Sequence, residues 1–432
     1  MIIKDVSWIR SSTGKLCPKL KKYALDWYRP TRLTPCFLQK IDRSFKLRWR
    51  KIPVIVQLDD PEISSLSNKE LCSLTGCRVK KRLSAIRSFS TEVNEKSLKD
   101  LVKNKNVKKI WYDSEVRAVL DMASPTVRAP RLWERGLTGK GIVVAVLDTG
   151  IYEHPDLSGR IWGFKDFVRD RKKAYDDNGH GTHVAGCIAA NGSESGGKYK
   201  GSAPEANLIG VKVLNKAGSG SMSTVIEGVL WCIEQKELLK IKIINLSLGS
   251  EAYQSYREDP LCEAVQQAWL SGIVVCAAAG NSGPEKGTIN SPGIAPLIIT
   301  VGASNDRNIA DPANNSVAGF SSRGPTIDGL EKPDVLAPGV ELVSLRSRRS
   351  LIDKTNKDAR VNNWYFSLSG TSMATPVFAG VAAQLLQADS SCSPDQIKKM
   401  LIASATKIPG EDNNNQGGGI ANAYKAAGML VK

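Results

Sequence analysis

Four residues of this chain stand at predicted turns and carry side chains suited to moving protons or attacking a carbonyl. Asp148 and Asn281 end the apolar runs GIVVAVLD and GIVVCAAAGN. His180 lies between two glycines in DDNGHGTHVAG, and Ser372 closely follows a glycine in SLSGTSMATPVFAGVAAQLL. Acyl transfer requires a nucleophile, a base that takes its proton, a carboxylate that orients the base, and donors for the oxyanion. The chain offers one candidate for each of these roles.

The segment around Ser372 predicts a tight turn followed at once by a helix. Gly370 permits a backbone angle that a side chain would forbid, and Pro376 is predicted in the first helical turn, which tolerates proline. The free N–H groups and positive end of such a helix suit an oxyanion. Ser and Thr are also common helix caps, so Thr371 or Ser372 could serve only as an N-cap.

The other candidates also have structural interpretations when each is taken alone. Asp148 could be a strand-end turn residue, and Asn281 could be a left-handed turn residue before a Ser-Gly pair. His183 is predicted to point into the packing one turn beyond His180, and His154 follows a loop and precedes a proline. A zinc pair of His180 and His183 is conceivable from spacing, but no HExxH pattern or further ligand accompanies it.

The elements that must position these residues alternate regularly after Gly136. Near-continuous Val/Ile runs alternate with helical segments, which predicts an α/β fold whose parallel sheet is covered by helices on both faces. In such sheets functional groups gather at the carboxyl ends of the strands. Asp148 and Asn281 are predicted at such ends, and His180 at the start of a helix.

The first third of the chain predicts a different, smaller architecture. From Ile52 the order strand, helix, two strands, helix, strand indicates an α+β, ferredoxin-like sandwich. Residues 1–50 are a basic, aromatic-rich extension without clear periodicity, and a proline-containing stretch from Ser114 to Arg131 marks a boundary. We therefore expect an extension over 1–50, a small domain over 51–120 and a large domain over 121–432.

Charge and cysteine content bear on partners and location. The formal charge is +17, and residues 1–124 hold 27 Lys and Arg against 13 Asp and Glu. Aromatics among basic residues could stack nucleic acid bases, yet no RNP or OB pattern is present, so nucleic acid binding is not expected.

Nine cysteines, an odd number, indicate free thiols in a reducing compartment. With no apolar signal core and no apolar run long enough to span a membrane, we expect a soluble cytoplasmic protein, with non-classical release conceivable.

Taken together, VLDTG, GHGTHVAG, AAAGNSG and GTSMATP resemble the subtilisin-like serine proteases, the peptidase S8 family, which uses the chain order Asp, His, Ser. The resemblance implies that Ser372 is the nucleophile, His180 the general base and then acid, and Asp148 the carboxylate that fixes the imidazole tautomer. It also implies that Asn281 donates its side-chain amide to the oxyanion, together with the Ser372 N–H. The expected reaction is peptide bond hydrolysis through an acyl-enzyme, with broad specificity.

The resemblance also implies where substrate and pro-region bind. Two extended edges resemble those between which the family clamps a peptide as an added strand: Gly218, Ser219, Gly220 and Ser247, Leu248, Gly249. The segments SSRGP and KPDVLAPGV are expected to support the Ser372 turn. The segment NEKSLKDLVKNKNVKKIWYDSEVRA looks like the end of an inhibitory propeptide, which predicts a self-processing precursor cut near Val119 to Ala123. Protein or peptide substrates and the chain's own pro-region are the expected partners.

Within the family the likeness is closest to the AprX-type bacterial subtilases. It is carried by DDNGHGTHVAG, EANLIGVKVLNKAGSG, EDPLCEAVQQAW and FSSRGPT with EKPDVLAPGV. One departure concerns metal: many secreted members of the family bind calcium through the HPDL aspartate and an Asn-rich loop after the catalytic helix. Here Asp156 is present but the loop reads NGSESGGKYKG, so no cofactor is expected for the chemistry and structural calcium is doubtful.

Two other functions stay open: a closed, non-catalytic peptide-binding protein, and a nucleic-acid or anionic-surface binder acting through residues 1–50.

Overall fold

The computed structural model describes most of the chain as two compact units, which are considered separately. The described residues are 6–12, 14–29, 46–47, 50–59, 66–83, 87–112, 123–307, 309, 311 and 314–430. One unit spans Met1–Val116 and the other Arg117–Lys432. The expected boundaries near residues 50 and 120 stay predictions, and the expected cleavage region at Val119 to Ala123 lies outside the described residues except for Ala123.

The smaller unit is an antiparallel sheet with the predicted element order. Its elements are β1 (Ile52–Leu58), α5 (Asn68–Thr75), β2 (Lys81–Leu83), β3 (Ser88–Val93), α6 (Glu95–Lys103) and β4 (Val107–Tyr112). The strand order is β2-β3-β1-β4, the order of a split βαβ sandwich. Alternate residues of β1 are buried, so one face of the sheet carries the core. Both helices begin at side-chain caps, a Ser67–Glu70 capping box for α5 and Asn94 for α6.

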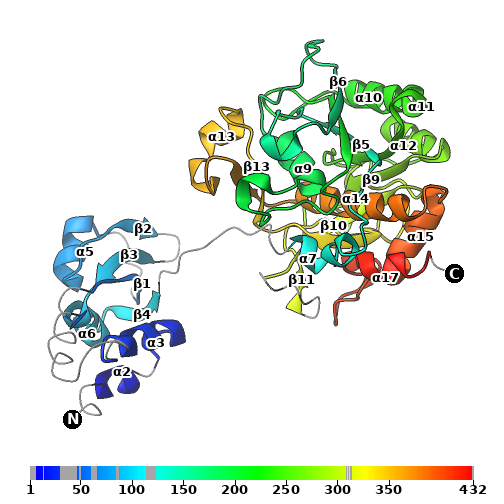
Figure 1. Cartoon of the computed structure of the whole chain (residues 1–432). Helices are drawn as coiled ribbons and strands as arrows, with labels where there is room; N and C mark the ends of the chain where they lie inside the picture. The colour runs from blue at the N-terminus through cyan, green and yellow to red at the C-terminus, as the bar shows by residue number, and fades with distance from the viewer. Residues whose placement is uncertain are drawn as a thin grey trace. The chain divides into compact units, whose positions relative to one another are not determined.

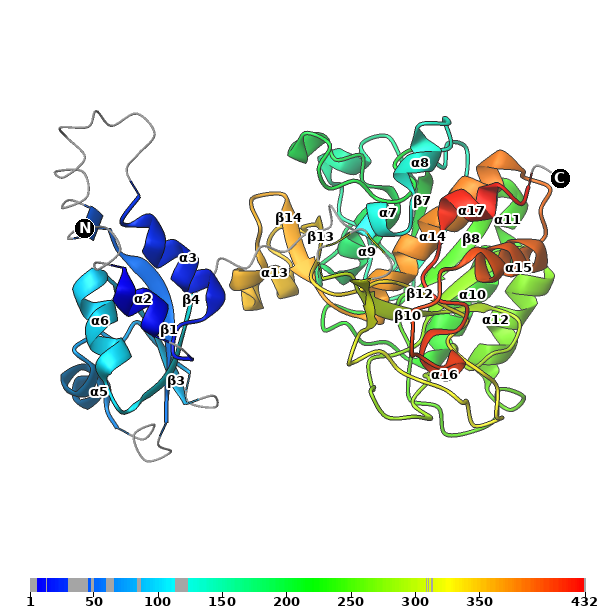
Figure 2. The same cartoon turned by 90° about the horizontal axis from the view of Figure 1, so that it is seen from below.

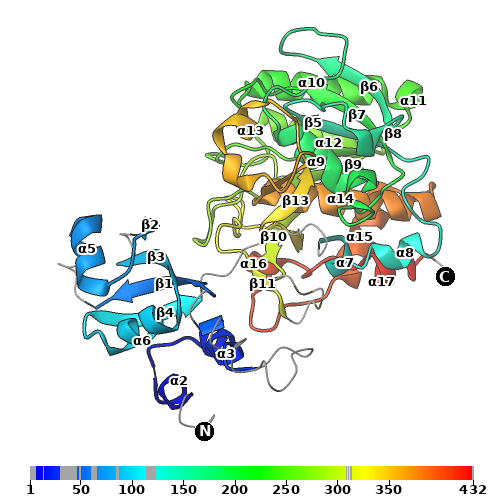
Figure 3. The same ribbon diagram turned by 60° about the vertical axis from the view of Figure 1, so that its left-hand side comes forward.

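Two helices from the N-terminal extension complete the core of this unit. They are α2 (Ser7–Ser11) and α3 (Pro18–Asp26), and α3 lies beside β4 (Figure 3). Trp27 is fully buried in the same hydrophobic core as Val54 and Val56, and the ring of Tyr23 stacks on Tyr112 at 4.3 Å. These aromatics are used for packing and are therefore not open platforms for bases. The aromatic residues Phe37, Phe45 and Trp49 lie outside the described residues.

The larger unit is built on a mostly parallel sheet, as the sequence predicts (Figure 1). Its strands are β5 (Val143–Asp148), β6 (Ile161–Asp166), β7 (Asn207–Lys212), β8 (Ile241–Leu246), β9 (Val274–Ala278), β10 (Ile299–Asn305), β11 (Ser316–Val317) and β12 (Val335–Pro338). The order is β11-β10-β9-β8-β5-β7-β6, with β12 also paired to β10, and β11 is the antiparallel strand. Every residue of β5, β7 and β9 is buried, which agrees with a sheet covered on both faces.

Helices cover this sheet in two layers (Figure 2). On one side lie α9 (His180–Ala189) and α14 (Thr371–Ala388), and on the other α10 (Met222–Glu234) and α12 (Pro260–Leu270). The remaining helices and turns are α7 (Ala123–Thr126), α8 (Pro130–Trp133), η4 (Pro155–Leu157), η5 (Ser193–Ser195), α11 (Lys236–Leu239), α15 (Pro394–Ser404), α16 (Asn413–Gln416) and α17 (Ala423–Ala427). The predicted α/β architecture is therefore confirmed.

A hairpin beside α9 carries one further short helix. It pairs β13 (Leu342–Leu345) with β14 (Tyr365–Leu368), and between the two strands lie α13 (Leu351–Thr355) and η7 (Lys357–Ala359). No helix in the described part of the chain is long and apolar enough to cross a membrane. The eight cysteines that the structure describes are all unpaired, and Cys36 lies outside the described residues.

Candidate active site

Asp148 ends the central strand β5 and is completely buried. The strand lies between β7 and β8, so the carboxylate emerges at the carboxyl edge of the sheet. The backbone N–H of Thr149 donates to Asp148 Oδ1 at 2.7 Å. This bond holds one carboxylate oxygen and fixes the orientation of the side chain.

His180 is the first residue of α9 and faces that carboxylate. Its Nδ1 lies 2.8 Å from Asp148 Oδ1 and 3.0 Å from Oδ2. Because an ionised carboxylate only accepts, Nδ1 carries the hydrogen and Nε2 is left as an acceptor. Burial lowers the pKa of His180, but the charge and hydrogen bond of Asp148 outweigh that effect and raise it above the ordinary value of 6.5.

A second buried carboxylate, Asp176, shapes the turn that precedes His180. Asp176 accepts from Thr149 Oγ1 at 2.9 Å, from the backbone N–H of Asn178 and Gly179 at 3.1 and 2.8 Å, and from Thr182. Burial raises the pKa of Asp176, while the hydrogen bonds from Thr182 and Gly179 oppose that effect. Because five donors bond to this one carboxylate, the loop is held in one conformation. The position of His180, the first residue of α9, is fixed with it.

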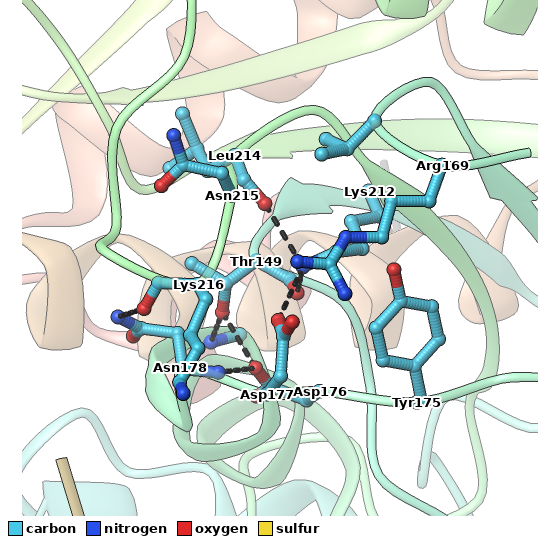
Figure 4. Close-up of polar contacts among 12 residues, drawn as sticks. Thr149, Arg169, Tyr175, Asp176, Asp177, Asn178, Lys212, Leu214, Asn215 and Lys216 are labelled. Carbon is cyan, nitrogen blue, oxygen red and sulfur yellow. Dashed lines mark hydrogen bonds and ion pairs between the residues drawn. The ribbon is translucent and has the colours of Figure 1, made fainter. Parts of the chain in front are cut away.

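Beneath this loop a buried lysine ties three chain segments together (Figure 4). Lys212, at the end of β7, is fully buried, and its Nζ contacts Asp177 Oδ1 at 2.8 Å and the Leu214 carbonyl at 3.0 Å. It also donates to the carbonyl of Thr149. The residue pairs with Asp148 across the β5–β7 ladder. Lys212 therefore joins the Asp148 strand end to the His180 loop.

Ser372 is the second residue of α14 and is held by glycine turns. The N–H of Gly370 donates to the carbonyl of Gly339 at 2.8 Å, so the KPDVLAPGV segment does support this turn. Gly370 has φ 157° and ψ 161°, a combination essentially restricted to glycine. Ser372 Oγ donates to the carbonyl of Ser247 at 3.1 Å, and no hydrogen bond joins it to His180 within the described residues. Such bonds often tighten only when substrate is bound.

Two expectations about this helix are resolved by its start. No side chain of α14 caps its own N-terminus, so neither Thr371 nor Ser372 is an N-cap. The prediction that Pro376 falls in the first turn is wrong, because α14 begins at Thr371 and Pro376 is its sixth residue. At that position a proline cannot donate to the Ser372 carbonyl four residues earlier.

Asn281 lies against the first backbone donor of α14. Its Oδ1 accepts from the Thr371 N–H at 2.9 Å and from Thr371 Oγ1 at 3.1 Å. This arrangement uses the amide oxygen and leaves the amide nitrogen as the free end of the side chain. Among the described residues, neither Asn281 Nδ2 nor the Ser372 N–H has a hydrogen-bond partner. Both donors thus stand free beside the serine hydroxyl.

A cavity of about 780 Å³ joins these residues. The predicted site residues His180, Ser372 and Asn281 line it, as do all six predicted edge residues: Gly218, Ser219, Gly220, Ser247, Leu248 and Gly249. Asp148 lies behind His180 and is not part of the lining. Sequence reasoning missed the contribution of Leu351, Ile352 and Thr355, which also line the cavity. No periodicity or motif in that segment marks it as part of a site.

Comparison with known proteins agrees with this geometry. The subtilase family profile matches residues 139–424. The chain belongs to the subtilase family. It is 47% identical over 429 residues to the serine protease AprX of Bacillus subtilis (strain 168), which covers 97% of each chain. It is 40% identical over 300 residues to subtilisin Savinase of Lederbergia lenta, covering 69% of this chain and 96% of that protein.

Two solved structures share the fold. The S41 psychrophilic protease matches with a TM-score of 0.56 and 35% identity, covering 66% of this chain and 92% of that chain. Sphericase matches with a TM-score of 0.56 and 34% identity over the same shares. The chain is therefore a subtilisin-like serine protease, a hydrolase that acts on protein substrates.

The other two histidines of this subtilase, His154 and His183, contact backbone carbonyls through their ring nitrogens. His183 Nε2 lies 3.0 Å from the Leu342 carbonyl and 3.1 Å from that of Phe366, so Nε2 carries the hydrogen. Burial lowers the pKa of His183 to about 3. His154 Nε2 lies 3.0 Å from the Trp364 carbonyl. No group of three or more potential metal ligands occurs in the parts of the chain that the structure describes.

The HPDL aspartate does not suit calcium in this subtilase. Asp156 accepts from the N–H groups of Gly192 and Glu194 at 3.1 Å and from Ser193 Oγ at 2.9 Å. The hydroxyl of Tyr365 donates to it at 2.7 Å. Its oxygens are thus occupied by hydrogen-bond donors, whereas calcium requires several oxygen ligands that face the ion. The residues present do not form a calcium site around Asp156.

Proposed function

We propose that this subtilase is a serine endopeptidase that works through Asp148, His180 and Ser372 and an acyl-enzyme intermediate. The observation that carries the proposal is the 2.8 Å contact between His180 Nδ1 and the buried Asp148, with Ser372 lining the same cavity. The Asp148 carboxylate holds the imidazole in the tautomer whose Nε2 can accept a proton.

In the proposed reaction Ser372 Oγ attacks the scissile carbonyl while His180 Nε2 takes its proton. The Ser372 N–H and Asn281 Nδ2 donate to the oxyanion, since both are free donors beside the hydroxyl. His180 then gives the proton to the leaving amine, the peptide bond breaks and the acyl-enzyme remains. Water, deprotonated by His180, hydrolyses the ester and restores the serine.

We propose that the substrate binds as an extended strand between the edges Gly218–Gly220 and Ser247–Gly249. Both edges line the cavity beside His180 and Ser372, and backbone pairing of this kind reads little sequence. No Asp, Glu, Lys or Arg is among the described residues that line the cavity. Neutral walls support broad, mainly apolar-directed specificity and disfavour a strict preference for basic residues.

The chain is further proposed to be a self-processing precursor. Residues up to Val116 form a compact unit of their own, which is consistent with a pro-region that folds separately and inhibits in place of substrate. The proposed cut lies near Val119 to Ala123. We also propose a reducing, cytoplasmic location, supported by the eight described cysteines, none of which is paired.

The decisive test compares the wild-type protein with Ser372→Ala. Both are purified, labelled with a fluorophosphonate, assayed on casein and subjected to N-terminal sequencing. We expect labelling, hydrolysis and a new N-terminus near residues 119–123 for the wild type and none of these for Ser372→Ala. Ser391→Ala, an exposed serine on a loop, serves as the matched control and should behave as wild type.

Contrary results separate the parts of the proposal. Persisting hydrolysis in Ser372→Ala would remove Ser372 as the nucleophile. An intact wild-type chain that hydrolyses casein would remove only the self-processing step. An intact chain with neither labelling nor hydrolysis would favour the alternative of a closed, non-catalytic peptide-binding protein.

A further inference from the structure

The helix α13 forms one wall of the active-site cavity. Its residues lie outside all of the sequence motifs that indicate the subtilase family. It lies beside β13 in the larger unit (Figures 1 and 3), and Leu351, Ile352 and Thr355 line the same cavity as His180. Leu351 and Ile352 are half-buried. Each therefore packs on the protein with one part of its side chain and leaves another part facing the cavity.

Backbone hydrogen bonds join α13 directly to the loop that carries His180. The N–H groups of Leu351 and Ile352 donate to the carbonyls of Asp177 and Asn178, both at 2.9 Å. These N–H groups are the first two of α13, which have no partner inside the helix. The carbonyls of the His180 loop thus accept the hydrogen bonds of the first two N–H groups of α13. These bonds fix the position of α13 relative to the loop.

The glycine before His180 makes this close approach possible. Gly179 has φ 110°, and a Cβ there would lie 2.6 Å from Ser350 Oγ and 3.7 Å from Ile352 Cβ. Ser347 Oγ also donates to the Asp176 carbonyl at 2.8 Å. Three consecutive carbonyls ahead of the histidine therefore accept hydrogen bonds from the α13 segment.

A buried carboxylate keeps the segment rigid. Asp353 is 4% exposed and accepts from Arg346 Nε and Arg360 Nε, both at 2.7 Å, and from the Arg349 N–H at 2.9 Å. Burial would raise the pKa of Asp353, but these hydrogen bonds lower it overall. The two arginines flank α13 in the sequence, so Asp353 closes the segment on itself. Charge-assisted bonds of this kind hold the wall in one conformation.

Asn178 links α13 to one of the two proposed substrate edges. Its carbonyl accepts from Ile352, while its Nδ2 donates to the Lys216 carbonyl at 2.9 Å. A Cβ at Gly218 would lie 3.2 Å from the same Nδ2. The wall is thus continuous with the edge Gly218–Gly220, at the side of the cavity where His180 lies. Leu214 adds a further apolar side chain to this lining.

We propose that Leu351 and Ile352 form a subsite for an apolar substrate side chain, that of the second residue on the acyl side of the scissile bond. The first acyl-side residue carries the scissile carbonyl beside Ser372, and its predecessor along the Gly218–Gly220 edge reaches His180 and α13. Half-buried Leu and Ile beside an uncharged lining favour a branched apolar partner. The inference rests on the proposed peptidase function and on the strand-like binding of the substrate.

The test measures kcat/KM on fluorogenic peptides that differ only at the second acyl-side residue, which is Gly, Ala, Val or Leu. For the wild type we expect kcat/KM to rise about tenfold or more from Gly to Leu, the range typical of added methylenes in an apolar pocket. Ile352→Ala and Leu351→Ala should lower kcat/KM for the Leu peptide about tenfold and leave the Gly peptide within twofold. Lys354→Ala, exposed on the same helix and absent from the lining, should match the wild type.

A further variant shows whether the lower kcat/KM of the alanine variants could result from unfolding. Ile352→Asp should raise kcat/KM for a peptide with Lys at the second acyl-side position relative to the Leu peptide, a gain that unfolding cannot produce. Equal losses on all peptides, or no change in selectivity at the second acyl-side residue, would overturn the inference. A wild type that hydrolyses none of the peptides would instead overturn the proposed function itself.

Discussion

The side-chain oxygen of Asn281 accepts the first backbone N–H of α14, from Thr371, at 2.9 Å. This contact decides which end of the amide faces the cavity. With the oxygen held at the helix start, the nitrogen is left as the free end of the amide in a residue that lines the same cavity as Ser372. Two neighbouring N–H groups of the same helix terminus thus differ, since that of Thr371 orients Asn281 while that of Ser372 stays free and is the proposed oxyanion donor.

Replacement of Asn281 by Ala should lower kcat about 100- to 1000-fold with little change in KM. The loss corresponds to about 2.7–4 kcal/mol of transition-state stabilisation, a magnitude carried over from an oxyanion-hole asparagine in subtilisin itself. Steady-state kinetics on a chromogenic peptide measure it. Asn191→Ala, at an exposed position after α9, is the matched control. A variant that changes KM alone would show that Asn281 binds substrate rather than the transition state.

The Asp148–His180 pair predicts the acid limb of the pH profile. His180 can act as the proposed base only when it is neutral, and its pKa lies above 6.5 because Asp148 outweighs the effect of burial. The wild-type kcat/KM should therefore fall as pH decreases through a midpoint above 6.5.

Asp148→Asn tests the cause of that midpoint. Without the carboxylate, burial is opposed only by the charge of Asp176, and the midpoint should move to lower pH. The rate should also fall about 10⁴-fold, since the amide no longer favours the productive tautomer. Profiles of kcat/KM from pH 4 to 9, on a peptide without titratable side chains, measure both effects. An unchanged midpoint in the variant would contradict the role of Asp148.

The ion pair between Lys212 and Asp177 is expected to stabilise the folded state. Lys212→Met should reduce the free energy of unfolding by about 3 kcal/mol, because it leaves a mostly buried carboxylate and two carbonyls without their donor. Urea unfolding in the Ser372→Ala background measures this without self-digestion. Lys216→Met, an exposed neighbour, should cost little. The double variant with Asp177→Asn should lose less than the sum of the single losses, and additivity would contradict a direct coupling.

Much of the site could be predicted because its residues stand at the ends of strongly patterned elements. Asp148 closes an unbroken apolar strand and His180 follows a glycine at a helix start, so parallel-sheet geometry alone brings them to one edge. The parallel sheet and its two helix layers follow from the same alternation, whereas the strand order required the structure. The short distance between the two side chains required the structure.

Other parts could not be predicted because they depend on contacts between distant segments. Ile352 meets Asn178 across more than 170 residues, and nothing in its own neighbourhood has a period or motif. Lys212 looks like an ordinary charged residue at the end of an apolar strand, and its burial is explained only by the carbonyls and the carboxylate around Nζ. Pro376 lies one turn further into α14 than the sequence predicts, because the start of a helix is poorly marked when a glycine turn replaces a side-chain cap.

His183 predicts acid destabilisation of the folded state. Its folded pKa is about 3, whereas an unfolded histidine has a pKa of about 6.5. Between these values the unfolded chain binds one more proton than the folded chain at this site. The free energy of unfolding therefore falls as pH decreases below about 6.5, by about 1.4 kcal/mol per pH unit from this residue, until the folded pKa is reached.

His183→Gln isolates this contribution, because the glutamine amide can still donate to the carbonyls of Leu342 and Phe366 but does not titrate. Urea unfolding between pH 4.0 and 5.5, with Ser372→Ala in both proteins, should show a slope against pH that is about 1.4 kcal/mol per unit smaller in the His183→Gln protein. His154, whose pKa burial also lowers, contributes equally to both proteins and cancels in the comparison. Equal slopes would mean that His183 takes up its proton without unfolding, and the neutral, buried imidazole described above would then be wrong.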